Sequence, residues 1–168
     1  MTNPTKPSFI DELRALGACP DAVAWSAGYS DPASAWQACE RGDWMLWICG
    51  RLSGAAESER RKQLVLCACD CARLSLPLFE KRYPGDQRLR TCIETAERWA
   101  KGDATMDELR AARAAAYAAY AAADAAYAVY AVYAAADAAA DAARNRVLKQ
   151  CAAIVRHHYP LPPTQGGN

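Results

Sequence analysis

The stretch RAARAAAYAAYAAADAAYAVYAVYAAADAAADAARNR, residues 110–146, decides the fold, because it consists almost entirely of Ala, Tyr and Asp. Alanine is the strongest helix former among the amino acids. Helical signals run from a capping box at Thr105 and Glu108 to His158, and Pro160 ends them. About fifty helical residues would span roughly 75 Å, which is longer than a small domain needs. We therefore expect a break near Asn145 that gives two packed helical segments.

Two faces emerge when successive residues of this stretch are placed about 100° apart. One face carries small side chains that let a neighbouring helix approach closely. It comprises Ala118, Ala125, Val129, Val132, Ala136, Ala140, Ala143, Val147 and Ile154. The other face winds around the helix and carries tyrosines between Asp and Arg residues. Since a tyrosine buries its ring but keeps a hydroxyl that needs a partner, this row belongs at a boundary rather than in a dry core.

The tyrosine row has two open interpretations. In the first it is structural, and its hydroxyls meet Asp side chains or water at the edge of the core. In the second it is a recognition surface, because Tyr and Arg are enriched at binding hot spots and Tyr can stack on a base or ribose. Arginines at the starts of two helices could add a site for phosphate. The candidate ligand-binding or partner-binding residues are Arg60, Arg61, Arg110, Arg113, Tyr117, Tyr120, Asp124, Tyr127, Tyr130 and Tyr133.

Helix signals dominate the rest of the chain, and strand signals are nearly absent. Caps and glycine stops predict three short helices before residue 43 and a central apolar helix from Asp43. Longer helices follow at about 58–83, which Pro77 should kink or split, and from Asp86 to Gly102. We expect an all-α, single-domain helical bundle over residues 1–159 and a disordered tail over 160–168. The expected core, packed on the small face of the C-terminal helix, is Trp36, Trp44, Trp47, Leu64, Leu66, Ile93 and Trp99.

The chain has eight cysteines, and most of them stand beside Ala, Leu or Ile. In CACDC, residues 67–71, Cys67 and Cys71 share one helical face while Cys69 points away. We interpret the thiols as small buried hydrophobes and expect no metal and no cofactor. Free thiols suit a reducing compartment, so we expect a cytoplasmic protein, in the host cytoplasm if a phage encodes it. The adjacent His157 and His158 favour the negative end of a helix dipole.

Charge and motifs exclude several classes of function. The 20 Lys and Arg residues nearly balance 19 Asp and Glu residues, so no overall field would attract nucleic acid or an anionic membrane. The Ala-rich stretch carries three Asp residues, which argues against a membrane span, and the opening MTNPTKPSF lacks the apolar run of a signal peptide. No motif places a nucleophile with a base, although Cys151 and His157 come nearest. We therefore predict no catalytic residues and no enzyme.

Three further stretches, read together with the Ala-rich tract, resemble one family. They are AWQACERGDWMLWICGRL at 35–52, ERRKQLVLCACDCARLSLPLFEKRYPGD at 59–86 and IETAERWAKGDAT at 93–105. These stretches are similar to the Imm-5-like immunity proteins, which are small helical proteins of actinobacteria, other bacteria and their phages. The resemblance extends from about Ala35 to Arg156. It implies a neutralising role and defines no catalytic residues.

The combined expectation is a non-enzymatic immunity or counter-defence protein that neutralises a toxin or defence component by stoichiometric binding. The alternative is a phage-type homo-oligomeric sponge that sequesters a nucleotide signal, such as a cyclic nucleotide or an ADP-ribose derivative, in a pocket lined by Tyr and Arg. A protein binder needs a contiguous exposed patch, whereas a sponge needs an enclosed pocket with convergent side chains. We expect a homo-oligomer without a nucleic-acid or membrane partner.

Overall fold

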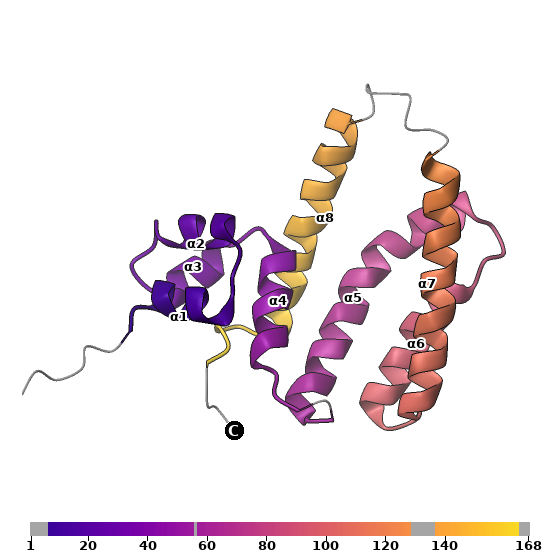
Figure 1. Cartoon of the computed structure of the whole chain (residues 1–168), viewed down its shortest axis with the longest axis horizontal. Coiled ribbons are helices and arrows are strands. Elements are labelled where there is room, and N and C mark those ends of the chain that lie inside the picture. Colours follow the sequence, from indigo (N-terminus) through magenta and orange to yellow (C-terminus); the bar gives the residue numbers. More distant parts are fainter. Residues whose placement is uncertain (1–6, 56, 129–136, 165–168) are drawn as a thin grey trace, which may run out of the picture.

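The computed structural model describes residues 7–55, 57–128 and 137–164, and within these ranges it describes all side chains except those of residues 119–128 and 137–141. All regular structure in the described ranges is helical, so the prediction of an all-α fold is confirmed (Figure 1). In chain order the helices are α1 Phe9–Leu16, α2 Pro20–Ser26, α3 Pro32–Ala38, α4 Gly42–Leu52, α5 Glu59–Arg82, α6 Arg88–Lys101, α7 Met106–Ala128 and α8 Asp137–His158.

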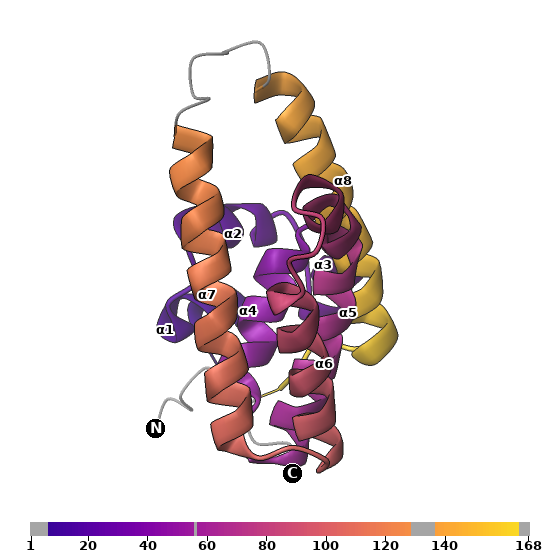
Figure 2. The ribbon, with the colours of Figure 1, turned by 90° about the vertical axis from the view of Figure 1, so that its right-hand side faces the viewer.

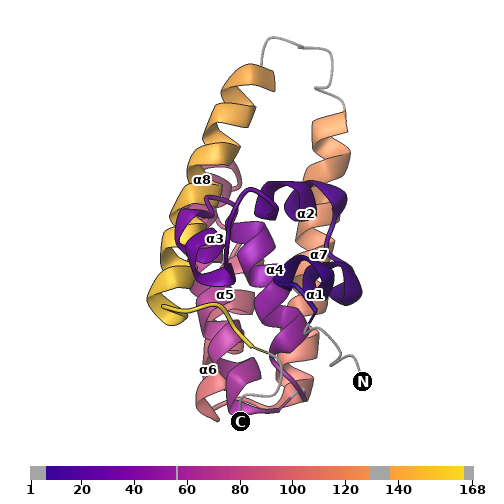
Figure 3. The ribbon, with the colours of Figure 1, turned by 90° about the vertical axis from the view of Figure 1, so that its left-hand side faces the viewer.

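The helices are arranged as a series of packed neighbours (Figure 1). The short helices α1, α2 and α3 form a group at one end, followed by α4 with α8, then α5, then α6 with α7. Figure 2 brings α6 and α7 to the front, and Figure 3 brings the group of short helices to the front. The two Ala-rich helices pack in different parts of the bundle, because α7 contacts α6 whereas α8 contacts α4 and α5.

The Ala-rich stretch belongs to two helices, but the expected break near Asn145 is wrong. Asn145 lies inside α8, where Ala and Arg neighbours favour helix and no Gly or Pro interrupts it. Residues 129–136, between α7 and α8, lie outside the described residues. The predicted small packing face is confirmed at Val147 and Ile154, which pack against the core, and is wrong at Ala118 and Ala143, which are exposed. It fails as a single face because α7 and α8 have different neighbours.

Pro77 lies within α5 without splitting it, since the helix continues to Arg82. The ribbon of α5 curves in Figure 1, which is the expected effect of a ring that removes one backbone hydrogen bond. Two ion pairs tie this helix to α6. Arg73 bonds both carboxylate oxygens of Glu97, at 2.8 and 2.9 Å, and Arg90 bonds both oxygens of Glu80, at 2.7 and 2.9 Å.

The core lies between α3, α4, α5 and the C-terminal half of α8, and it is rich in thiols. Cys67 and Cys71 face this core, and the Cys71 thiol lies 3.9 Å from the Cys151 carbonyl oxygen. Cys69 faces α6 instead, with its sulfur 3.7 Å from the carbonyl oxygen of Ile93. The two-faced arrangement predicted for the CACDC run is therefore confirmed.

The predicted core is confirmed in part. Trp36, Leu64 and Trp99 are buried, whereas Trp44, Trp47, Leu66 and Ile93 are half-buried. Positions that the prediction omitted are more deeply buried, above all small or flexible side chains on helices that meet closely: Met45, Cys49, Cys67, Ala152 and Val155. Large rings could not occupy these positions, because the backbones there are too close together.

Gly42 allows a close approach between α4 and α8. A Cβ atom at this position would lie 2.7 Å from the backbone nitrogen of Ala152 and 2.9 Å from the carbonyl carbon of Cys151. These are backbone atoms of α8 and cannot rotate away. Only glycine therefore lets the first turn of α4 sit directly on α8.

The segment that follows α8 fastens the short helices to the rest of the bundle. The Trp36 indole nitrogen donates to the carbonyl oxygen of Tyr159 at 2.8 Å, and the Gln37 amide donates to that of Pro160 at 2.9 Å. The Arg156 guanidinium donates to the Cys39 carbonyl oxygen at 2.6 Å. The predicted tail begins at Pro160, whose carbonyl oxygen accepts the bond from Gln37 on α3. Residues 165–168 lie outside the described residues.

We predict that Gly42→Ala lowers the free energy of unfolding by about 2 kcal/mol, because the added methyl group must displace the backbone of α8. The matched control is Gly50→Ala in the same helix, where a Cβ would meet only the Leu64 Cδ2 atom, at 3.8 Å. That change should raise stability by about 0.5–1 kcal/mol through helix propensity. Urea unfolding followed by circular dichroism measures both. Equal effects of the two changes would contradict a close contact at Gly42.

Thiol labelling should follow burial. We expect a maleimide to modify the exposed Cys19 first and the core thiols only on unfolding, since reaction requires access and a thiolate. Burial raises the pKa of Cys49 and of Cys151 to about 12, so both thiols stay protonated near neutral pH. Mass spectrometry of tryptic peptides after a short exposure to the reagent identifies the modified cysteines. Early labelling of Cys49 or Cys151 would contradict the packing described for α4 and α8.

The same thiols predict an alkaline loss of stability. Burial raises the pKa of Cys49, Cys69 and Cys151 from 9.0 to about 12, so the folded chain keeps protons that the unfolded chain releases. The stabilisation is present below pH 9 and is lost as the pH rises through 12. Urea unfolding at several pH values should show the free energy falling across this window. In Cys49→Ala the fall should be shallower, and an unchanged slope would contradict this assignment.

Candidate functional site

The predicted Arg and Tyr residues lie on two different helices. Arg60 and Arg61 are in the first turn of α5, where Arg61 donates to the Gly54 carbonyl oxygen at 3.2 Å and Arg60 to that of Thr164 at 3.5 Å. Arg110 and Arg113 lie on α7. Both α5 and α7 pack on α6, so the two arginine pairs lie on helices that share one neighbour.

Arg113 and Tyr117 form an ordered pair on α7. The Arg113 guanidinium donates to the Tyr117 hydroxyl at 3.2 Å, and its central carbon lies 5.4 Å from the centre of the ring. Tyr117 remains 61 % exposed, which is unusual for a large ring. One turn earlier, Arg110 pairs with Asp107 at 2.7 Å. This arrangement presents a tyrosine ring and two arginines to solvent.

The remaining predicted positions are not described. The side chains of Tyr120, Asp124 and Tyr127 lie outside the described side chains, and Tyr130 and Tyr133 lie outside the described residues altogether. Their assignment as binding residues stays a prediction. Of the predicted set, the described residues place Arg113 in direct contact with Tyr117.

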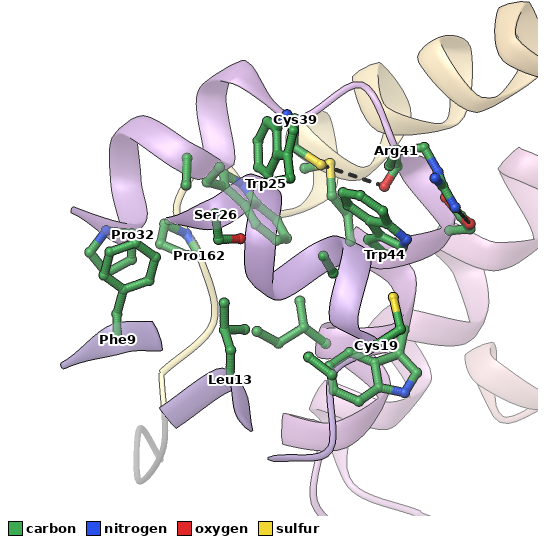
Figure 4. A pocket seen from close by; sticks show the side chains of 18 of the residues that line it. Phe9, Leu13, Cys19, Trp25, Ser26, Pro32, Cys39, Arg41, Trp44 and Pro162 are labelled. Carbon is green, nitrogen blue, oxygen red and sulfur yellow. Dashed lines mark hydrogen bonds and ion pairs between the residues drawn. The ribbon is translucent and has the colours of Figure 1, made fainter. Parts of the chain in front are cut away.

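A pocket of about 480 Å³ opens among the short helices (Figure 4). It is lined by α1, α2, α3 and α4, and Pro162 of the segment after α8 also borders it. Most of its lining is apolar. The aromatic part of the lining consists of Phe9, Trp25, Trp36, Trp44 and Trp47.

The rings in this pocket are in contact with one another. The Trp25 ring centre lies 6.0 Å from that of Trp44 and 4.7 Å from that of Tyr29. The Arg41 guanidinium carbon lies 4.2 Å from the Trp44 ring centre, within the range of a cation–π contact. The aromatic wall is therefore held in place by packing and by one cation.

The polar groups in the pocket are few. Arg41 bonds both oxygens of Asp43, at 2.8 and 2.6 Å, and these bonds hold the pKa of the Asp43 carboxyl below its usual value. The two opposite charges cancel within the pair. Burial raises the pKa of the Cys39 thiol, whose sulfur lies 3.7 Å from the Arg41 carbonyl oxygen. Ser26 is only 8 % exposed as a residue and lines the pocket. No fully buried side-chain oxygen or nitrogen in the described residues lacks a hydrogen-bond partner, so the Ser26 hydroxyl, which bonds no described protein group, reaches the open space of the pocket.

This pocket was not predicted, because Trp36, Trp44 and Trp47 were expected in the core. A signal was present, since four of the five tryptophans occur between residues 25 and 47. In this region the helices are seven to eleven residues long. Helices as short as α2 and α3 cannot cover so many large rings, so a partly open aromatic cavity results.

Within the described ranges, no group of three His, Cys, Asp or Glu side chains is arranged to hold a metal ion. His158 instead pairs with Asp70, with 2.8 Å between Nε2 and Oδ2, and so joins the end of α8 to α5. None of the described helices combines the length and apolar character that crossing a lipid bilayer requires.

The fold and the surface define a class of helical protein with an exposed Arg and Tyr patch and an aromatic pocket. The family model described as "Imm-5 like putative immunity protein" matches residues 54–153. The match covers more than half of the chain, so the protein belongs to this immunity family and the predicted resemblance is confirmed. Searches of curated proteins and of solved structures gave no match.

Proposed function

We propose that the protein neutralises a toxin by stoichiometric binding, without catalysis, and that α7 provides the contact surface. The observation that carries the proposal is the family match, which extends from residue 54 to residue 153 and includes α7. Immunity proteins act on a toxin partner. The proposal therefore needs an exposed surface within the matched residues that is suited to protein recognition.

The Arg113–Tyr117 pair supports α7 as this surface. Arginine and tyrosine are among the residues that contribute most to binding energy at protein interfaces. The 3.2 Å hydrogen bond and the stacked guanidinium hold both side chains in one arrangement before binding. Pre-ordering of this kind reduces the conformational entropy lost when a complex forms.

One cation on this surface is open to an acidic partner. Arg110 is paired with Asp107, and Arg98 at the end of α6 lies 3.7 Å from Glu108 at the start of α7. Arg113 bonds the Tyr117 hydroxyl and has no carboxylate partner among the described residues. A carboxylate on the partner can bond this guanidinium in bidentate fashion.

The nucleotide-sponge alternative needs an enclosed pocket with convergent Arg and Tyr side chains. Arg113 and Tyr117 lie on an outer helix face, and the arginine in the aromatic pocket is paired with Asp43. These observations favour the protein-binding proposal. Native mass spectrometry with cyclic nucleotides and ADP-ribose derivatives tests the alternative and reports the oligomeric state, and discrete nucleotide mass on a fixed oligomer would support the sponge.

The function is tested by co-expression with a library of DNA fragments from the source genome. We expect some fragments to kill the host alone and to be tolerated with this protein. The Arg113→Ala and Tyr117→Ala double variant should bind the encoded toxin about 30-fold more weakly, which corresponds to about 2 kcal/mol, and should lose protection. Titration calorimetry with the purified toxin measures the affinity and the ratio.

The matched control is Leu78→Ala, which shortens another exposed side chain, 66 % exposed, on α5. It should protect as well as the unmodified protein. Protection by the Arg113 and Tyr117 double variant at full affinity would exclude α7 as the contact surface. Neutralisation by substoichiometric amounts of protein would exclude the stoichiometric mechanism and indicate catalysis.

A further inference from the structure

We propose that the aromatic pocket lined by α1, α2, α3 and α4 is a binding site for a small, uncharged, ring-containing molecule with one hydrogen-bonding group. The site is built around Trp25, Trp44 and Ser26. Its lining residues lie outside residues 54–153 and do not belong to the α7 surface. The proposed site is therefore independent of the proposed toxin contact.

The size and the walls of the pocket fit such a ligand. A volume of about 480 Å³ lies within the range of roughly 300–1,000 Å³ that small-molecule sites occupy. Tilted rings such as Trp25 and Trp44, 6.0 Å apart, provide surfaces for offset or edge contacts with a flat ligand. An apolar ring that enters the pocket replaces water against these surfaces, which is favourable in proportion to the area covered.

The charges of the pocket select an uncharged ligand. Arg41 and Asp43 line it, but each carries the other's counter-charge through two short hydrogen bonds. A phosphate or carboxylate would have to compete with the Asp43 carboxylate for the guanidinium. A charged ligand would also lose its hydration on entering an apolar cavity, without a free charged partner among the described lining residues.

Ser26 points to one polar group on the ligand. It belongs to the last turn of α2, is more than nine-tenths buried and lines the pocket (Figure 4). The Ser26 hydroxyl bonds no protein group within the described ranges and is accessible from the pocket, because no fully buried side-chain oxygen there lacks a partner. A ligand hydroxyl, carbonyl or amine in the pocket can therefore bond it.

The walls of the pocket are held by contacts within the protein. Its Trp36 wall is fixed by the 2.8 Å hydrogen bond to the Tyr159 carbonyl oxygen, and the Trp44 wall is fixed beneath Arg41. The helices behind these walls are anchored to α8 through the 2.6 Å bond from Arg156 to Cys39. Binding therefore requires little ordering of the protein.

The experiment uses N-phenyl-1-naphthylamine, an uncharged dye whose fluorescence rises in apolar surroundings and which accepts energy from excited tryptophan. We expect saturable binding to the full chain with energy transfer from the pocket tryptophans. Ala22→Phe, which places a ring in the pocket, should weaken dye binding at least tenfold. Its matched control is Ala24→Phe on the same helix, at an exposed position outside the lining, and this variant should bind the dye normally.

A second arm tests the hydrogen-bonding group with two competitors of similar shape, 1-naphthol and naphthalene. Ser26→Ala should weaken displacement of the dye by 1-naphthol about fivefold, the effect of losing one hydrogen bond, and should leave naphthalene unchanged. This arm stays decisive if Ala22→Phe fails to fold, because removing one hydroxyl leaves the walls intact.

Three results would overturn the proposal. The first is the absence of saturable dye binding to the full chain, and the second is equal dye affinity of Ala22→Phe and Ala24→Phe when both variants are folded. The third is that Ser26→Ala weakens displacement of the dye by 1-naphthol and by naphthalene to the same extent. Circular dichroism and the Tm of each variant establish whether it is folded. Because the α7 surface is unaltered in all of them, toxin protection measured in parallel tests the proposed function separately.

Discussion

The close contact between α4 and α8 is the interaction on which the rest of the bundle depends. A glycine at the start of α4 lets the backbone of α8 approach, and small side chains on α5 and α8 fill the space that remains. Thiols suit this position because they are apolar, compact and polarizable. With α8 in place, α3 gains the polar partners that hold the short helices, and α5 gains a second neighbour besides α6.

Much of the local structure follows from the sequence. The Ser8, Asp31 and Ser58 side chains each accept a hydrogen bond from the first turn of a helix, and Thr105 and Glu108 bond reciprocally at the start of α7. These interactions span three residues, so a short pattern predicts them. The neighbours of each helix are set by non-local contacts. A short sequence pattern does not contain these contacts. The pattern therefore predicted one continuous small face, whereas α7 packs on α6 and α8 packs on α4 and α5.

The candidate sites divide in the same way. Arg113 and Tyr117 are four residues apart on a helix, a spacing that brings side chains together whatever the tertiary structure. The pocket depends on how four helices and Pro162 meet, and no local pattern encodes that. Three of its tryptophans, Trp36, Trp44 and Trp47, were predicted as core residues, but apolar character alone does not distinguish a filled core from an open cavity. The Ser26 hydroxyl can be recognised as a ligand-facing group only once the lining of the pocket is known.

The hydrogen bond from Trp36 to Tyr159 joins residues that are 123 positions apart, and the bond from Arg156 to Cys39 spans 117. During translation the short helices leave the ribosome long before α8 does, so these two bonds form only after the end of the chain has emerged. Contacts of such long sequence separation form late and slow folding. The tryptophan-rich segment can therefore pack among its own short helices early, but it gains its anchor on α8 only when synthesis is complete.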